Sequence, residues 1–136
     1  LIAGRATLDQ PGRMLSLSPG GRTQGFALRF DEDNLEEELL MVWRREMVAG
    51  SYQPDWAELN LHDGRKAKAI IFRADPQGQL HEHDDSISTV SPIIAKAEGI
   101  LGSNIDYVMQ LDDTLKKHNF SDDYVAQLAH QLRSAS

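Results

Sequence analysis

Apolar residues recur at two different periods along the chain, and glycine and proline separate the segments that carry them. Alternation of apolar with polar or small residues over 13–17 and 24–30 predicts two strands joined by a Pro-Gly-Gly turn. The same alternation over 56–61 and 67–72 surrounds Asp63-Gly64, a pair typical of a tight hairpin. We therefore expect the first half of the chain to contribute two strand pairs.

Helical spacing of apolar residues begins after the acidic stretch 31–34 and continues to the neighbourhood of Gly50. Further helices are predicted in the last third, over 87–97, 105–115 and 124–132. Strands early and helices late are typical of an antiparallel α+β fold. With 136 residues, the chain has the length of a single domain, which we expect to span residues 1–136.

Composition narrows the classes of function. The chain has no cysteine, which excludes a thiol nucleophile, a thiolate zinc site and a disulfide framework, and which suits a reducing, cytoplasmic location. Its 14 Lys and Arg against 21 Asp and Glu oppose binding to nucleic acid, because phosphate contacts need unopposed cations. The longest apolar runs, 39–43 and 69–72, are far shorter than a membrane crossing requires. We expect a soluble protein with neither nucleic acid nor membrane as its partner.

Glu46 is the acid that the helical pattern singles out. At 100° per residue from Leu35, Val42 falls at about −20° and Glu46 at about 20°, in the middle of the apolar stripe. Burial there disfavours the charged carboxylate and suits proton exchange near neutral pH. The alternative is that the helix frays after Trp43, so that Glu46 reaches water or pairs with Arg45 or another cation.

Other candidate residues each allow two interpretations. Tyr52 follows the predicted helix and either turns back over Glu46 or packs as an amphipathic aromatic. Tyr107 lies at the edge of an apolar band, as a core aromatic or as a pocket hydroxyl. The His- and Asp-rich run 81–85 favours a solvated loop over a metal site. The glycines of 99–104 favour a turn and helix cap over a phosphate site.

Three stretches of this sequence resemble the ChaC-type gamma-glutamylcyclotransferase family. The most specific is Trp43-Arg44-Arg45-Glu46-Met47 with its sequel Gly50-Ser51-Tyr52-x-Pro54-x-Trp56. The glycine-bearing stretches within 11–25 and 99–107 are also similar to that family. The resemblance extends from about Gly4 to the last predicted helix.

The resemblance implies a fold, a reaction and a set of site residues. The fold is a small mixed β-barrel with flanking helices, which agrees with the α+β expectation. The reaction cleaves glutathione, a small-molecule substrate, into 5-oxoproline and cysteinylglycine, with neither a metal nor an organic cofactor. Glu46 matches the family's essential glutamate and is the expected general acid/base. Tyr52 and Tyr107 occupy positions similar to substrate-lining tyrosines.

One part of the family pattern lies outside residues 1–136. The family begins with a strand that ends in a Tyr-Gly-Ser-type loop, whose backbone amides hold the gamma-glutamyl end of the substrate. The printed sequence does not include this loop, so we expect that an N-terminal piece precedes Leu1. Two alternatives stay open: a non-catalytic interaction or regulatory module linked to cation transport, and a cyclotransferase for other gamma-glutamyl compounds.

Overall fold

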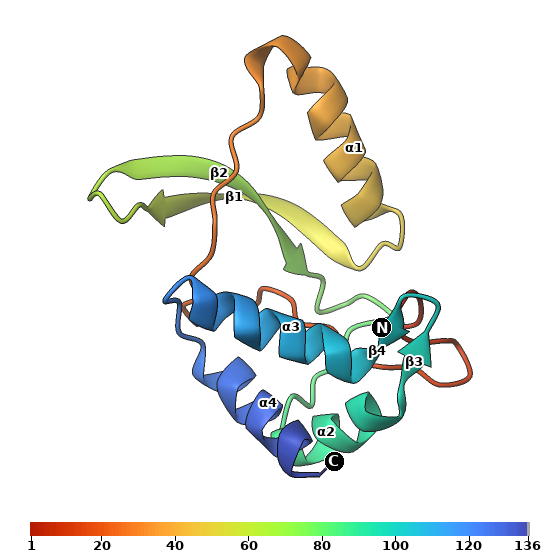
Figure 1. Cartoon of the computed structure of the whole chain (residues 1–136). Coiled ribbons are helices and arrows are strands. Elements are labelled where there is room, and N and C mark those ends of the chain that lie inside the picture. Colours follow the sequence, from red (N-terminus) through yellow and green to blue (C-terminus); the bar gives the residue numbers. More distant parts are fainter. Residues whose placement is uncertain (136) are drawn as a thin grey trace. The chain divides into compact units, whose positions relative to one another are not determined.

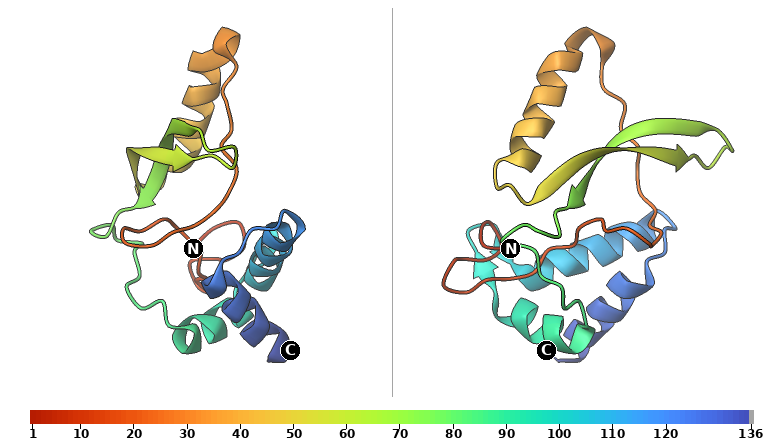
Figure 2. Two further views of the ribbon diagram at one scale, coloured as in Figure 1. Left: turned by 90° about the vertical axis from the view of Figure 1, so that its left-hand side faces the viewer. Right: turned by 180° about the vertical axis from the view of Figure 1, so that it is seen from behind.

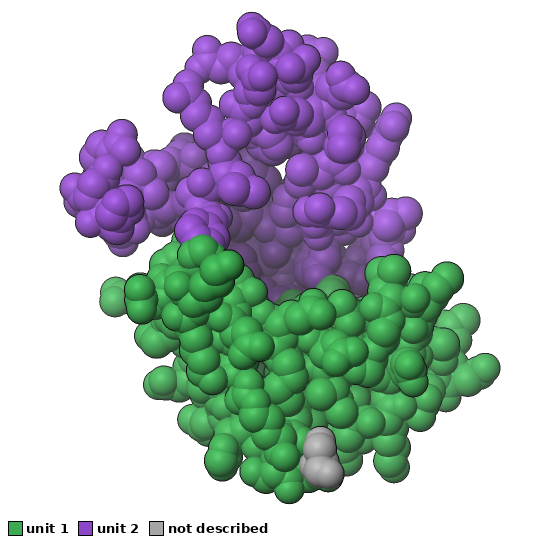
Figure 3. All heavy atoms as spheres, viewed as in Figure 1, with its two compact units in different colours: residues 1–15, 22–25, 82–136 green, residues 16–21, 26–81 purple. Residues whose placement is uncertain are grey.

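The computed structural model describes residues 1–135 and divides them into two compact units. Unit 1 contains Leu1–Leu15, Arg22–Gly25 and the chain from Glu82 onward. Unit 2 contains Ser16–Gly21 and Phe26–His81 (Figure 3).

Unit 2 contains one helix and one hairpin of strands (Figure 1). A short 3₁₀ turn, η1 (Glu32–Asn34), leads into α1 (Leu35–Met47). The side chain of Asp31 caps η1 by accepting a hydrogen bond from the backbone N–H of Asp33 at 3.1 Å. After α1, Gly50 adopts a φ of 64°, a left-handed conformation that glycine adopts without strain. The predicted helix is confirmed, with Met47 as its last residue.

The hairpin of unit 2 consists of β1 (Tyr52–Asn60) and β2 (Lys66–Ala74), which pair antiparallel from Tyr52 opposite Ala74 to Asn60 opposite Lys66. The connecting turn is closed by a hydrogen bond of 2.8 Å from the Leu61 N–H to the Arg65 carbonyl. The long, twisted ribbon that results is seen most clearly in the right-hand view of Figure 2. The second predicted strand pair is therefore confirmed and is longer than the sequence pattern indicated.

The first predicted strand pair, over 13–17 and 24–30, is wrong for the described structure. Of these residues only Leu17 forms a bridge, an isolated parallel one, and its partner is Arg73 on β2. Phe26 is 64% exposed and Leu28 is 90% exposed, so the alternation there forms no buried face. A two-stranded ribbon without a buried face is marginal in water, and the predicted pair had no such face.

Unit 1 is a packed group of three helices, α2 (Ile87–Lys96), α3 (Asn104–Lys117) and α4 (Asp123–Ser134), with two very short strands, β3 (Glu98–Gly99) and β4 (Gly102–Ser103). Apolar residues of all three helices form its core: Val90, Ile94, Val108, Leu128, Ala129 and Leu132. Because each helix turns one apolar face to this cluster, the three helices expected from periodicity are confirmed.

The N-terminal segment of unit 1 lies along the start of α3, held by side chains of that helix. The fully buried Asn104 binds both backbone groups of Arg13: its Oδ1 accepts from the Arg13 N–H at 2.7 Å, and its Nδ2 donates to the Arg13 carbonyl at 2.9 Å. One turn later, the Tyr107 hydroxyl accepts from the Leu15 N–H at 3.3 Å. These bonds give a segment without regular structure a defined course.

The secondary structure confirms the α+β class, with helices and small antiparallel sheets in one chain. Both sheets among residues 1–135 are two-stranded, so these residues form no closed barrel. Within the described part of the chain, the outer edge of β2 is paired only at the isolated bridge between Arg73 and Leu17.

Asp112 is a buried acid whose charge is held by two cations. Its carboxylate is only 3% exposed and lies 2.7 Å from both Lys116 Nζ and Arg133 NH2. Burial by itself would raise the pKa of Asp112, but the hydrogen bonds from Lys116 and Arg133 outweigh it, so the pKa lies below its usual value. The ionised form is therefore the one that stabilises the fold.

Replacing Asp112 with asparagine is expected to lower the free energy of unfolding by about 1–2 kcal/mol near neutral pH, since both cations are partly exposed and screened. Because the folded pKa is depressed, this contribution is present above the unfolded pKa of about 4 and is lost as the pH falls through the folded value. Urea unfolding of the full-length wild type and of Asp112→Asn, near neutral pH and in acid, measures this contribution. Asp113→Asn is the control, because that carboxylate is 74% exposed and lies 3.6 Å from Arg133. A loss of stability in Asp112→Asn that is equally large in acid would contradict the assignment.

Candidate active site

Glu46 is the second-to-last residue of α1, so the helix does not fray before it. Its side chain is 22% exposed, and its Oε1 accepts a hydrogen bond from Arg45 Nε at 2.7 Å. The partial shielding of the carboxylate agrees with the interpretation as a proton-exchanging acid, whereas its pairing with Arg45 is what the alternative interpretation expected. A shielded carboxylate with a defined orientation can act as a general acid and base.

The end of α1 that carries Glu46 packs on the hairpin of unit 2. The ring of Trp43 meets the ring of Phe72 edge to face, with centroids 6.3 Å apart and an angle of 69° between the planes. Charged side chains of the hairpin are paired with one another: Asp55 with Arg73 at 2.8 Å and Glu58 with Lys66 at 2.6 Å. The cation bonded to Glu46 is therefore one from its own helix.

The two tyrosines predicted to line a pocket belong to different units. Tyr52 is the first residue of β1, half-buried and in the same unit as Glu46, so the expectation that it turns back over Glu46 stays a prediction. Tyr107 belongs to unit 1, where its ring packs against the helical core and its hydroxyl binds the Leu15 backbone. Burial raises the pKa of Tyr107 although the Leu15 N–H opposes this, so the phenol stays protonated.

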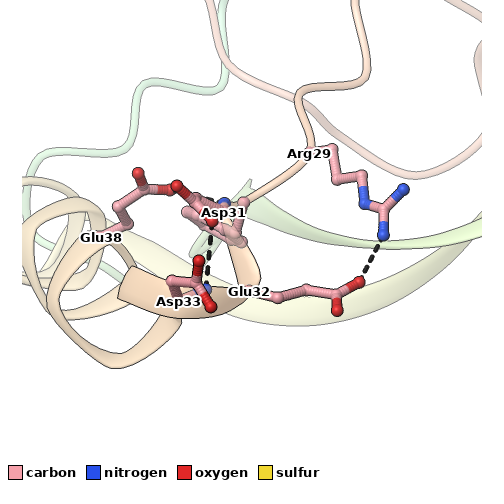
Figure 4. Close-up of a pocket in the computed structure, with 6 residues that line it drawn as sticks. Arg29, Asp31, Glu32, Asp33 and Glu38 are labelled. Carbon is pink, nitrogen blue, oxygen red and sulfur yellow. Dashed lines mark hydrogen bonds and ion pairs between the residues drawn. The ribbon is translucent and has the colours of Figure 1, made fainter.

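Two surface hollows lie away from these residues. The hollow in unit 2 is lined by Arg29, Phe30, Asp31, Glu32, Asp33 and Glu38. Figure 4 shows that charged residues of this hollow interact with one another around the turn. Arg29 pairs with Glu32, and Glu38 accepts from the Asp31 N–H at 3.1 Å. The hollow in unit 1 is lined by Arg22 and Ser121–Tyr124. Neither is lined by Glu46, Tyr52 or Tyr107.

A comparison with known protein families matches residues 1–135 to the model of the ChaC-like proteins. This chain belongs to the ChaC-like family. A glutathione-specific gamma-glutamylcyclotransferase of Escherichia coli (strain K12) is 47% identical over 123 residues, which are 90% of this chain and 53% of that relative. Gamma-glutamylcyclotransferase 2-3 of Arabidopsis thaliana is 24% identical over 95% of this chain and 69% of its own length. The chain thus spans about half the length of the bacterial relative.

Two further observations on this ChaC-like chain concern metal binding and membrane crossing. The His- and Asp-rich run 81–85 lies in a loop, and no group of three His, Asp or Glu among residues 1–135 is arranged to hold a metal ion. In the same described range, no helix combines the length and apolar character that crossing a membrane requires.

The sequence pattern did not indicate the part that Asn104 plays in the ChaC-like chain. The stretch 99–104 predicts a turn and helix cap, and Ser103 is the cap, accepting a hydrogen bond from the Asp106 N–H at 3.0 Å. Asn104 instead faces inward and holds the Arg13 backbone. A polar amide directly after a capping serine and before an apolar residue was the available signal, because a buried amide needs partners of its own.

Proposed function

We propose that the full-length protein is a glutathione-specific gamma-glutamylcyclotransferase. The observation that carries this proposal is the 47% identity to the bacterial enzyme of that name over 90% of the chain. The largely shielded carboxylate of Glu46 also supports the proposal, because the reaction needs an acid that can exchange protons. Glu46 lies where the helical pattern places an acid on an apolar stripe. The substrate is then a small molecule, and we propose a cytoplasmic location, where glutathione is kept reduced.

In the proposed reaction, Glu46 moves the proton twice. The alpha-amine of the gamma-glutamyl group begins as an ammonium and gives a proton to Glu46. Its lone pair then attacks the gamma-carbonyl carbon of the same molecule, and a new C–N bond closes the ring. The bond between that carbon and the cysteine nitrogen breaks, and Glu46 returns the proton to the departing nitrogen. The ring nitrogen still carries two hydrogens and loses one as a proton, which the departing amine takes up, so that 5-oxoproline keeps a single N–H and cysteinylglycine leaves as an ammonium. Because nucleophile and carbonyl belong to one molecule, the enzyme needs chiefly to hold the substrate bent.

Tyr52 and Tyr107 are proposed to line the substrate. The Tyr107 hydroxyl is suited to this because the Leu15 N–H occupies one of its acceptor positions, which leaves its own hydrogen to be donated. Its raised pKa keeps that hydrogen in place across the physiological range. Both residues then contact the substrate without taking part in proton transfer.

For the complete protein we propose the single-domain, small mixed β-barrel that the family resemblance implies. Two observations support further strand pairing. The sheet of unit 2 has only two strands, although such ribbons are marginal by themselves. In addition, the alternating segment 26–30 carries the exposed Phe26 and Leu28, side chains that a larger sheet would cover.

The function is tested by incubating the full-length protein with glutathione and measuring 5-oxoproline and cysteinylglycine together. We expect the two products in equal amounts. Competition with other gamma-glutamyl compounds then measures specificity, since a pocket that hydrogen-bonds cysteinylglycine rejects analogues without it. Turnover of those compounds but not of glutathione would favour a different cyclotransferase, and no turnover of any would favour a non-catalytic module.

A further inference from the structure

We infer that Arg45 is a positioning residue, which holds one oxygen of the Glu46 carboxylate so that the other can exchange the proton. The observation is the hydrogen bond of 2.7 Å between Arg45 Nε and Glu46 Oε1. The inference rests on the proposed function, because it assigns Arg45 a part in that reaction.

The geometry of the pair is not one that a helix produces by itself. Successive residues on a helix point about 100° apart and do not face each other, whereas residues three or four apart do. Arg45 and Glu46 are nevertheless joined, with Arg45 Nε 2.7 Å from Glu46 Oε1. The pair is asymmetric: the Arg45 side chain is 75% exposed, while the Glu46 side chain is 22% exposed.

A purely structural role explains this pair poorly. Ion pairs whose cation is in solvent contribute little to stability. The pair joins neighbours on one helix, so it ties no distant parts of the chain together. Its physical effect is therefore local: it restricts the orientation of a single carboxylate.

This restriction suits a carboxylate that must both take and give a proton. A guanidinium stays protonated under all relevant conditions, so Arg45 can hold Oε1 without competing for the transferred proton. Oε2 is then the atom assigned to proton exchange with the substrate amine. Holding the acceptor in a productive geometry, instead of letting it rotate, is worth a large factor in rate.

Other charges near this end of α1 do not duplicate Arg45. On the hairpin against which the helix packs, Asp55 and Arg73 pair with each other, as do Glu58 and Lys66, and Lys68 lies 6.0 Å from the Trp56 ring centroid. On α1 itself, Arg44 has the same charge and the same length one residue earlier. Arg44→Gln is thus the matched control for Arg45→Gln.

The test measures kcat and KM for glutathione, together with the melting temperature, in full-length wild type and in Arg45→Gln, Arg45→Lys and Arg44→Gln. We expect Arg45→Gln to lower kcat by about 10–100-fold with little change in KM or melting temperature. Arg45→Lys keeps a cation, so its kcat is expected to lie between those of wild type and Arg45→Gln. Arg44→Gln is expected to match wild type.

Three results, each with an active wild type, would overturn the inference while leaving the proposed function intact. The first is an unchanged kcat and KM in Arg45→Gln, and the second is a kcat in Arg45→Lys as low as that of Arg45→Gln. The third is a higher KM with unchanged kcat in Arg45→Gln. The last would make Arg45 a substrate-binding residue. A full-length wild type that releases no 5-oxoproline would overturn both the proposed function and this inference.

Discussion

Replacing Glu46 with glutamine in the full-length protein is expected to lower kcat for release of 5-oxoproline by about 10²–10⁴-fold, the range that a positioned acid/base group contributes. Glutamine has the same shape but cannot take the proton from the ammonium, so the nucleophile is not formed. It also cannot return a proton to the departing amine. Substrate binding does not require this exchange, so KM is expected to change much less than kcat.

The matched control for this prediction is Glu37→Gln, the same change on an exposed position of the same helix. Its kcat is expected to equal that of wild type. Circular dichroism and melting temperature verify that both variants fold, and the fold of Glu46→Gln is expected to persist because its partner Arg45 is largely in solvent. If Glu46→Gln retained full turnover, Glu46 would have no part in the mechanism, whatever the family of the chain.

The helices were predictable because the information that makes them is local. In α4, Val125, Leu128 and Leu132 repeat at helical spacing into the core. The hairpin of β1 and β2 was predictable for a related reason, since its turn and both strands are contiguous in the sequence. Short-range patterns sufficed in both cases.

The strands predicted over 13–17 and 24–30 failed because pairing depends on what a segment meets in space. The alternation was real, but its residues are distributed between the two units: Leu15 and Gln24 belong to unit 1, while Leu17 and Leu28 belong to unit 2. The Gln24 side chain accepts from the Ser121 N–H at 3.3 Å, and Leu17 bridges to Arg73. Neither partner could be read from the local pattern.

In the candidate site, too, local features could be predicted from the sequence and long-range contacts could not. The position of Glu46 on the apolar stripe followed from helical geometry, and its partial burial agrees with that. The partner of the Tyr107 hydroxyl did not follow, because Leu15 lies 92 residues earlier in the chain. Local periodicity can place a residue on a face, but a long-range hydrogen bond depends on a segment that has no pattern of its own.

Replacing Asn104 is expected to produce the largest loss of stability, because its side chain satisfies two backbone groups at once. Asn104→Ala leaves the Arg13 N–H and carbonyl without these partners and opens a small void, and we expect the free energy of unfolding to fall by about 2–4 kcal/mol. Urea unfolding of the full-length protein measures this. Asn60→Ala, at the exposed end of β1, is the matched control and is expected to cost far less.

Asn104→Asp separates this hydrogen-bond pairing from the simple filling of space. Aspartate has nearly the same shape, but it places an oxygen where Nδ2 now donates to the Arg13 carbonyl at 2.9 Å, and it buries a charge at a position with no exposure. Burial and the facing carbonyl favour the protonated acid, so its folded pKa is raised and its cost shrinks as the pH falls. Relative to wild type, Asn104→Asp is therefore expected to regain stability from about pH 7 to about pH 5, whereas Asn104→Ala is not. Equal losses in both variants at every pH would mean that the shape of the side chain, and not its donor and acceptor, holds the N-terminal segment on α3.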